Sequence, residues 1–443
     1  MNIRLSDNFT YRKLLRFTLP SMVMMIFTSI YGVVDGFFVS NYVGKTPFAA
    51  INLIMPFLMM LGAVGFMIGA GGSALVAMTL GKGDDKKANS IFSLLIYIVI
   101  GTGLLFSLLG IVFTEPVAVF LGASGEMLPY CVEYGRVILL ALVPFMLQNV
   151  FQSFLITAER PTLGLVVTTV SGCANMLLDW LFMAVLQWGI TGAAYATAAA
   201  QVIGGVIPLV YFILPNNSRL RLGRTSLDKK AIGKACLNGS SEFMTNISMS
   251  IVSMIYNFQL MKYAGEDGVS AYGVLMYVGF IFIAAYLGFS VGSAPIVGYH
   301  YGAKNSGELK GLFRKSLIII GIMTVVLFAL AELFARPISM IFVNYDAGLL
   351  EMTVGAFRIH ALSFIVSGFN IYGSGFFTAL NNGLISALIS FGRTLVFQVI
   401  AVLLLPMILG TEGIWFAGVA AEGAAIVLTV FCFIKKRKDY NYA

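Results

Sequence analysis

The chain alternates long apolar runs with short polar segments, and this pattern predicts its elements. Windows of about 19 residues identify twelve apolar spans, which begin near residues 14, 48, 90, 127, 161, 192, 231, 267, 311, 350, 384 and 413. Runs of about 20 residues are long enough to cross the hydrocarbon core of a bilayer as helices. Strand-like alternation is absent, so helices and not a barrel should satisfy the backbone. The pattern predicts an all-α polytopic membrane protein with twelve transmembrane helices.

Composition supports the same class. Of the 443 residues, 59% are hydrophobic and 11% are charged, and the mean hydropathy is +0.90. A soluble protein of this size carries nearer to about 25% charged residues, because it must cover its surface with polar groups. The lipid bilayer is therefore the expected surrounding of most of the chain.

Lysine and arginine are distributed unevenly between the loops. Loops on one side, including the two termini, hold 22 of them, whereas the opposite loops hold three: Lys45, Lys262 and Arg336. The positive-inside rule then places both termini in the cytoplasm. The net charge of +8 reflects this topology, so nucleic-acid binding is not expected. No cleavage site follows the first span, which should be retained in a bacterial cytoplasmic (inner) membrane.

The sequence offers little support for enzyme chemistry. The four cysteines are scattered without metal-ligand spacing, and only two histidines are present. The glycine-rich run at 69–73 lacks the lysine of a phosphate-binding loop, and small residues for helix packing explain it better. We therefore expect a protein that is not an enzyme and binds no cofactor. We expect it to be a monomer.

The chain carries an internal duplication. Gly81, after the second span, matches Gly302, after the eighth, at an offset of 221 residues, and the same offset aligns Ala50 with Ala271. Two six-helix lobes are predicted, 1–225 and 226–443, joined by a basic cytoplasmic linker at about 216–234. Because six is even, both lobes enter the bilayer in the same direction. They should be related by a pseudo-two-fold axis along the membrane normal and enclose a cleft.

Two aspartates stand inside apolar runs, where an ionised carboxylate costs several kcal/mol. Asp179 lies in the fifth span with Asn175 one helical turn before it, and Asp35 lies in the first span. Two carboxylates drawn close in low dielectric do not both stay ionised cheaply, so the pair should bind a proton or a cation. The residues alone do not choose between H⁺ and Na⁺.

These motifs, in their order and spacing, resemble the multidrug and toxic compound extrusion (MATE) family, within its MepA-like bacterial branch. The resemblance covers essentially the whole chain. It rests on Leu19–Pro20 with Asp35, on 81–84 and 301–304, on 157–161, on Asn175 with Asp179, and on 192–197, 390–393 and 413–417. It implies a twelve-helix, two-lobed antiporter that exports organic, often cationic, compounds by alternating access, driven by a proton or sodium gradient.

The resemblance also implies the ion-coupling residues. The family's amino-terminal site falls here on Asp35, Asn175, Asp179 and Thr197, which is also where Na⁺ would bind if sodium is the coupling ion. Some members instead place a sodium site in the other lobe, built from a Glu on the seventh helix and an Asp on the tenth, and Glu242 is the candidate for the first of these. The tenth span, 363–380, contains no acidic residue, which puts that second site in doubt.

A cleft for varied small organic substrates needs apolar walls with a few polar or aromatic groups. Polar or aromatic residues inside the spans are the candidates: Gln148, Asn149, Gln152, Glu242, Tyr256, Asn257, Tyr272, Tyr277, Asn370 and Tyr372. Each alone is better explained by helix packing than by a ligand contact, but as a set they indicate an amphiphilic cleft. Glu242 is either a cleft carboxylate or a helix-end residue, and Glu422 is expected to pair with Arg393.

The alternative functions differ in the charge they require. A lipid-linked oligosaccharide flippase of the same superfamily would need a cationic cleft for a diphosphate, whereas Asp35 and Asp179 are acidic. The arginines near or within spans are Arg136, Arg358 and Arg393. A non-enzymatic receptor is a further possibility, but duplicated halves favour alternating access.

Overall fold

The computed structural model describes residues 3–43, 45–344 and 346–443; the side chains of Ser40 and Lys45, the latter among the outer-loop cations counted above, lie outside the described part. The described residues form helices joined by short turns. The helices of the first half are α1 (Tyr11–Tyr42), α2 (Lys45–Gly81), α3 (Asp85–Phe120), α4 (Met127–Leu140), α5 (Leu142–Thr157), α6 (Pro161–Asp179), the π-helical turn η1 (Trp180–Val185) and α7 (Gly189–Ile213).

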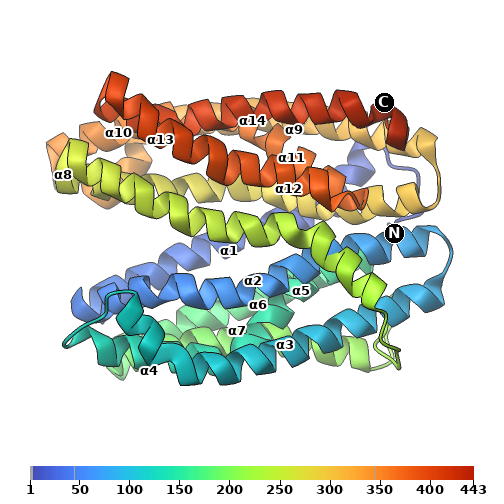
Figure 1. Ribbon diagram of the computed structural model, residues 1–443, viewed down its shortest axis with the longest axis horizontal. Coiled ribbons are helices and arrows are strands. Elements are labelled where there is room, and N and C mark those ends of the chain that lie inside the picture. The colour runs from blue at the N-terminus through green and yellow to red at the C-terminus, as the bar shows by residue number, and fades with distance from the viewer. Residues whose placement is uncertain (1–2, 44, 345) are drawn as a thin grey trace.

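The second half repeats this plan. Its helices are α8 (Lys229–Gly302), α9 (Ser306–Val343), α10 (Ala347–Ala361), α11 (Phe364–Ala379), α12 (Gly383–Phe391), the π-helical turn η2 (Gly392–Val396), α13 (Phe397–Leu409) and α14 (Thr411–Tyr440). In Figure 1 the helices α2 to α7 fill one layer and α8 to α14 the other, with α1 passing between them.

The described helices correspond to the twelve predicted spans when each of two bent helix pairs counts as one span and the broken helix α8 counts as two. Nine helices are long and apolar enough to cross a membrane, and two further spans are the bent pairs α4–α5, at 55°, and α10–α11, at 49°. Gly265 breaks α8 into two arms, with φ of 64° and ψ of −154°. This conformation strains any residue with a Cβ. The two arms are the predicted seventh and eighth spans.

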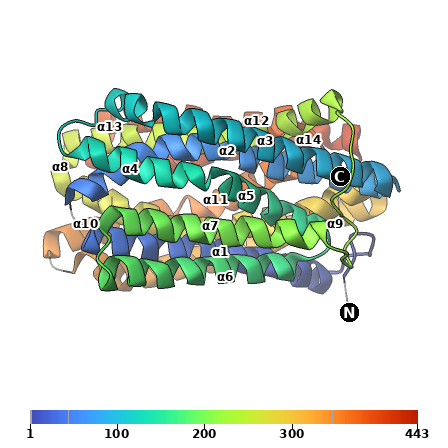
Figure 2. The ribbon, with the colours of Figure 1, turned by 90° about the horizontal axis from the view of Figure 1, so that it is seen from below.

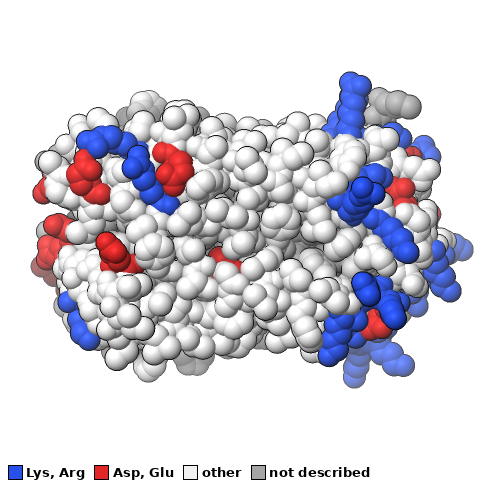
Figure 3. All heavy atoms as spheres, turned by 90° about the horizontal axis from the view of Figure 1, so that it is seen from above, with Lys and Arg blue, Asp and Glu red and all other residues white. Residues whose placement is uncertain are grey.

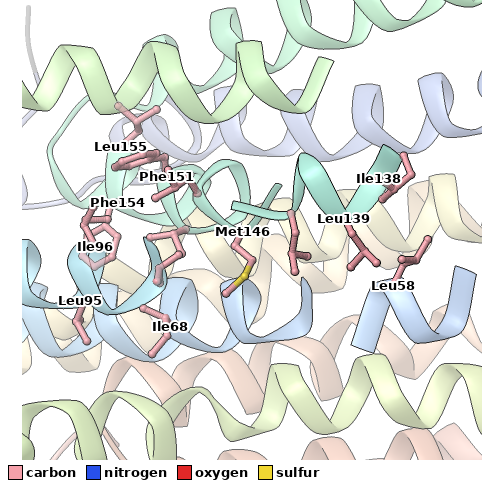
Figure 4. Packing of buried hydrophobic residues seen from close by; sticks show 14 of the residues in the cluster. Leu58, Ile68, Leu95, Ile96, Ile138, Leu139, Met146, Phe151, Phe154 and Leu155 are labelled. Carbon is pink, nitrogen blue, oxygen red and sulfur yellow. The ribbon is translucent and has the colours of Figure 1, made fainter. Parts of the chain in front are cut away.

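The core of the first half is built from apolar side chains of α2 to α5 and α7. The ring centroid of Phe92 lies 4.9 Å from that of Phe154 and 4.9 Å from that of Phe212. Figure 4 shows further members of this cluster, among them Met146 at the kinked region where α4 meets α5. This core fixes the positions of α5 and α7 around the polar residues described below.

Charged side chains gather at the two ends of the molecule. In the space-filling view, lysine and arginine crowd one end, the other end carries acidic residues together with a few basic ones, and the middle band is mostly uncharged (Figure 3). Both chain termini lie at the basic end (Figure 1). An uncharged band between two charged ends is what a bilayer-spanning protein requires.

Candidate functional site

Three neighbouring helices carry the polar residues predicted to converge. Asp35 lies on α1, Asn175 and Asp179 lie one turn apart on α6, and Thr197 lies on α7. The three helices run side by side in Figure 2 and pack against one another in the structure. Asp179 is the last residue of α6, directly before the π-helical turn η1. Such turns occur frequently at functional sites, because the widened backbone re-aims the side chains around it.

The structure brings all four side chains together. Asn175, Asp179 and Thr197 each lie within interaction range of the Asp35 carboxyl group. Asp179 is fully buried and Asn175 is 2% exposed, whereas Asp35 is only partly buried. The cluster therefore extends from a partly accessible carboxyl group on α1 to a completely enclosed one on α6.

Oxygen atoms in this cluster lack ordinary hydrogen-bond partners. Among the described residues they are Asp35 Oδ1, Asn175 Oδ1, both carboxyl oxygens of Asp179 and Thr197 Oγ1. A buried acceptor without a donor costs about 1–3 kcal/mol, and more when it is charged. A proton shared between the carboxyl groups, or a small cation, would satisfy several of these oxygens at once. No group of three or more His, Cys, Asp or Glu side chains able to hold a metal ion occurs in the described part of the chain.

Aromatic residues enclose the acidic pair, and sequence reasoning did not include most of them. Tyr31 and Tyr134 lie near enough to interact electrostatically with Asp35. Tyr31 is one helical turn before Asp35, which is the signal that pattern reading could have used. Tyr277, predicted as a cleft residue, reaches this site from the second half: its hydroxyl is 3.5 Å from where a Cβ on Gly36 would be.

The polar residues of α5 that were predicted to line the cleft lie in the first half of the molecule. Gln148 is 8% exposed and lies against Gly204 of α7. Asn149 is also buried, and its amide nitrogen has no hydrogen-bond partner. Gln152 is partly buried. Among the described interactions, no hydrogen bond joins these residues to the acidic cluster.

Candidates in the second half fall into two sets. Tyr256 and Tyr272 stack face to face at 4.9 Å, and the Tyr256 hydroxyl donates to Gln398 Oε1 at 2.8 Å. Asn257 and Tyr277 are exposed, and the Tyr277 hydroxyl reaches Gly36 of α1 as described above. Asn370 and Tyr372, by contrast, lie fully inside the packing of α11.

A buried ion pair organises the interior of the second half. Arg393 Nη1 lies 3.3 Å from Glu422 Oε1, which confirms the predicted pairing. Asn370 Nδ2 donates to Glu422 Oε2 at 2.7 Å and to the Glu422 carbonyl at 3.0 Å, while the Thr429 hydroxyl donates to Asn370 Oδ1. Glu242 is partly buried and within electrostatic range of Arg393. The pair thus links η2, α11 and α14.

Replacing Glu422 by alanine should strongly destabilise the protein, because it leaves the Arg393 charge and the Asn370 amide buried without partners. Removing one member of a buried pair costs about 3–5 kcal/mol. Thermal unfolding in detergent measures the loss. In the double variant Arg393→Met with Glu422→Leu, much of that stability should return. Unaltered unfolding of Glu422→Ala would contradict a structural role for the pair.

The similarity to known proteins extends over both halves of the chain. The MatE family model matches the chain twice, over residues 20–181 and 243–404. The multidrug export protein MepA of Staphylococcus haemolyticus (strain JCSC1435) is 23% identical over 423 residues, covering 95% of this chain and 92% of that protein. MepA of Staphylococcus aureus (strain NCTC 8325 / PS 47) is 23% identical over 374 residues, covering 84% of this chain and 82% of its own.

Solved structures share the whole fold. An outward-facing multidrug resistance MATE family transporter superposes with a TM-score of 0.93 at 22% identity, and each chain is covered to 98%. A MATE protein in complex with MaL6 gives 0.93 at 21% identity with the same coverage. A MOP superfamily transporter from Pyrococcus furiosus gives 0.90 at 22% identity. Since the family model matches most of the chain, in two successive copies, this protein belongs to the MatE family of multi-pass membrane transporters.

Proposed function

We propose that this protein is an antiporter that exports organic, often cationic, drugs or toxic compounds in exchange for H⁺ or Na⁺. The observation that carries the proposal is the enclosed Asp179 carboxyl group beside Asp35, surrounded by oxygens without hydrogen-bond partners. Such a cluster is poised to bind and release a small cation. The multidrug export activity named for the similar MepA proteins supports the choice of substrate class.

In this proposal Asp35 and Asp179 exchange the coupling ion, while Asn175 and Thr197 supply neutral oxygens and hydrogen bonds. Substrate would enter a cleft between two lobes, 1–225 and 226–443, related by a pseudo-two-fold axis along the membrane normal. The repeated family match and the arrangement of the helices in Figure 1 support this division. The remaining cleft candidates, Glu242 among them, would line its walls.

The same proposal places the monomeric protein in a bacterial cytoplasmic membrane with both termini inside. The basic end of Figure 3, at which both termini lie, is the end that the positive-inside rule assigns to the cytoplasm. The bacterial origin of the similar MepA proteins supports the choice of membrane.

A diphosphate-carrying flippase fits the charges less well. Each arginine near or within the spans already lies beside a carboxylate: Arg393 beside Glu422, Arg358 beside Glu332 at 3.7 Å, and Arg136 in a surface hollow with Glu115 and Glu133. These arginines are therefore electrostatically compensated. The acidic residues of the described site therefore attract a cation more strongly than a diphosphate.

Reconstitution into proteoliposomes tests the proposal. A fluorescent organic cation is loaded, and a proton gradient or a sodium gradient is imposed, one at a time. We expect uphill movement of the cation with one of the two gradients and none without a gradient. Movement that ignores both gradients would refute ion-coupled antiport.

The proposal also predicts how substrate affinity depends on pH. A monocationic substrate should bind more weakly to the wild-type protein at low pH, because protonation of the carboxyl groups removes the negative charge that attracts it. Linkage requires that the substrate lowers proton affinity by the same factor. In Asp35→Asn one titrating partner is absent, so the pH dependence should flatten. Binding isotherms in detergent from acidic to alkaline pH measure it; equal steepness in both proteins would remove Asp35 from the coupling.

A further inference from the structure

Two apolar side chains of the segment before α1 are buried, although the segment forms no helix or strand. Residues 3–9, which we call the strap, run across the basic end of the molecule before the chain enters the first helix. Leu5 is fully buried and Phe9 is 1% exposed. Both belong to an apolar cluster whose other members come mostly from α8, α9 and α11. Irregular segments usually run over the surface, because buried backbone groups need hydrogen-bond partners, so these contacts need an explanation.

Side chains from both halves hold the backbone of the strap. The Leu5 amide donates to Glu159 Oε1 at 2.8 Å, and Glu159 stands in the turn between α5 and α6 of the first half. The Phe9 amide donates to Glu308 Oε1 at 2.8 Å, and Glu308 is in the first turn of α9 in the second half. Lys315, also on α9, donates to the Phe9 carbonyl. Hydrogen bonds of this kind, to a charged partner, are the stronger ones in proteins.

The strap covers the line along which the two halves touch. At this end α2 and the second arm of α8 approach so closely that a Cβ on Gly81 would collide with the Tyr299 carbonyl, and one on Gly302 with the Met78 carbonyl. The ring of Phe9 packs edge-on against His300, next to Tyr299, with centroids 6.3 Å apart. The strap and the contact between α2 and α8 therefore lie at the same end of the interface between the two halves.

The two ends of the strap are held with unequal strength. Phe9 has two hydrogen-bonding partners on α9 and a buried ring in the second-half cluster. The Leu5 amide has one hydrogen bond in the structure, to Glu159 in the turn between α5 and α6. The other end of the strap continues into α1, whose first turns, with Leu14 and Phe17, belong to the same second-half cluster. If the halves separate at this end, the Leu5–Glu159 bond is the contact that breaks with the least loss.

We propose that the strap is a tie across the inner gate, by which we mean the contact between α2 and the second arm of α8 at the basic end. The strap stays with the second half and holds this gate shut through the Glu159 carboxylate. Glu159 must release Leu5 each time the transporter opens inward. This inference rests on the proposed alternating access. Glu159 acts here as a positioning residue that sets the balance between two states and touches neither ion nor substrate.

Distance measurements between spin labels test the tie. Lys86 of α3 and Lys310 of α9 are exposed, lie in different halves and are close to the gate, so both are changed to cysteine for labelling. The four native cysteines are replaced by serine first. In Glu159→Ala the population with the longer separation should rise about tenfold relative to the parent, the effect of losing one hydrogen bond to a charged group.

A matched variant and a truncation make the result specific. Glu159→Gln keeps an oxygen that accepts from the Leu5 amide, so its distances should stay near those of the parent. A chain lacking residues 2–6 keeps Phe9 and its partners but loses Leu5, so it should behave as Glu159→Ala does. Unchanged distances in both Glu159→Ala and the truncated chain would overturn the tie.

The same measurement separates this inference from the function on which it rests. If the parent protein shows two distance populations that drug or pH shifts, but the strap variants leave them unchanged, the tie alone is refuted. If the parent shows one distance under every condition, alternating access fails and the tie fails with it. Two populations with the predicted shifts in the variants support both.

Discussion

Asp179→Asn should abolish gradient-driven efflux while leaving the protein folded. The change removes an enclosed ionisable group of the acidic cluster and keeps the shape of the side chain. Removing a buried charge in a helix bundle is often neutral or stabilising, so expression and thermal unfolding should be preserved. Efflux of a fluorescent cation from energised proteoliposomes measures the effect. The loss should be complete within detection, because the remaining Asp35 has no second carboxyl group with which to share the coupling ion.

The matched control for this variant is Asp267→Asn. Asp267 lies exposed in the second arm of α8, at the end opposite the termini, and carries the same chemical change without touching the cluster. Its efflux should equal that of the wild type. A well-expressed Asp179→Asn protein that exported drug at the wild-type rate would remove Asp179 from the mechanism.

The arrangement of the spans followed from the sequence because hydrophobic length is decisive in a membrane. Every predicted start corresponds to a described helix or helix arm, within a few residues at most positions. The bend between α4 and α5 was not predicted, although Pro144 in the first turn of α5 offered a local signal: a proline cannot donate a backbone hydrogen bond to the Leu140 carbonyl at the end of α4. Gly265 also offered a local signal, and the structure uses it to turn α8 back on itself.

Convergence at the acidic cluster was also predictable, because a carboxylate in an apolar run needs a compensating partner. The structure gathers Asp35, Asn175, Asp179 and Thr197 as the resemblance implied. Tyr31 and Tyr134 were not predicted to surround them, because a tyrosine in an apolar span is equally well explained by packing. Their place depends on the rotation of α1 and α4 about their own axes, which is set by contacts between helices and not by local pattern.

The strap was beyond sequence reasoning for a different reason. Residues 3–9 are too short to show a periodicity, and charged residues beside a terminus are normally solvated. Their burial depends on Glu159 and Glu308, which are about 150 and 300 positions away along the chain. Only the packing of both halves brings these two carboxylates to the same end of the molecule. The contacts of the strap with both halves are therefore seen in the structure and not in the sequence.

Gly302→Ala should open the inner gate and sharply reduce efflux. A methyl group at Gly302 collides with the Met78 carbonyl, which is backbone and cannot rotate away, so α2 and α8 must move apart. Overpacking of this kind costs about 1–3 kcal/mol, which changes the balance between closed and open gates by a factor of roughly 5 to 150. Spin labels at Lys86 and Lys310 should report the longer distance as the main population, and efflux should fall because the outward-facing state is rarely reached.

Gly81→Ala should give the same result, because Gly81 meets the Tyr299 carbonyl at the position that the duplication matches to Gly302. The control is Gly273→Ala on the same helix as Gly302, where a Cβ has no neighbour within 4 Å. There the substitution should leave distances and efflux unchanged and slightly favour the helix, since alanine is the better helix former by about 0.5–1 kcal/mol. Wild-type distances in both Gly81→Ala and Gly302→Ala would show that the close approach of α2 and α8 does not hold the gate shut.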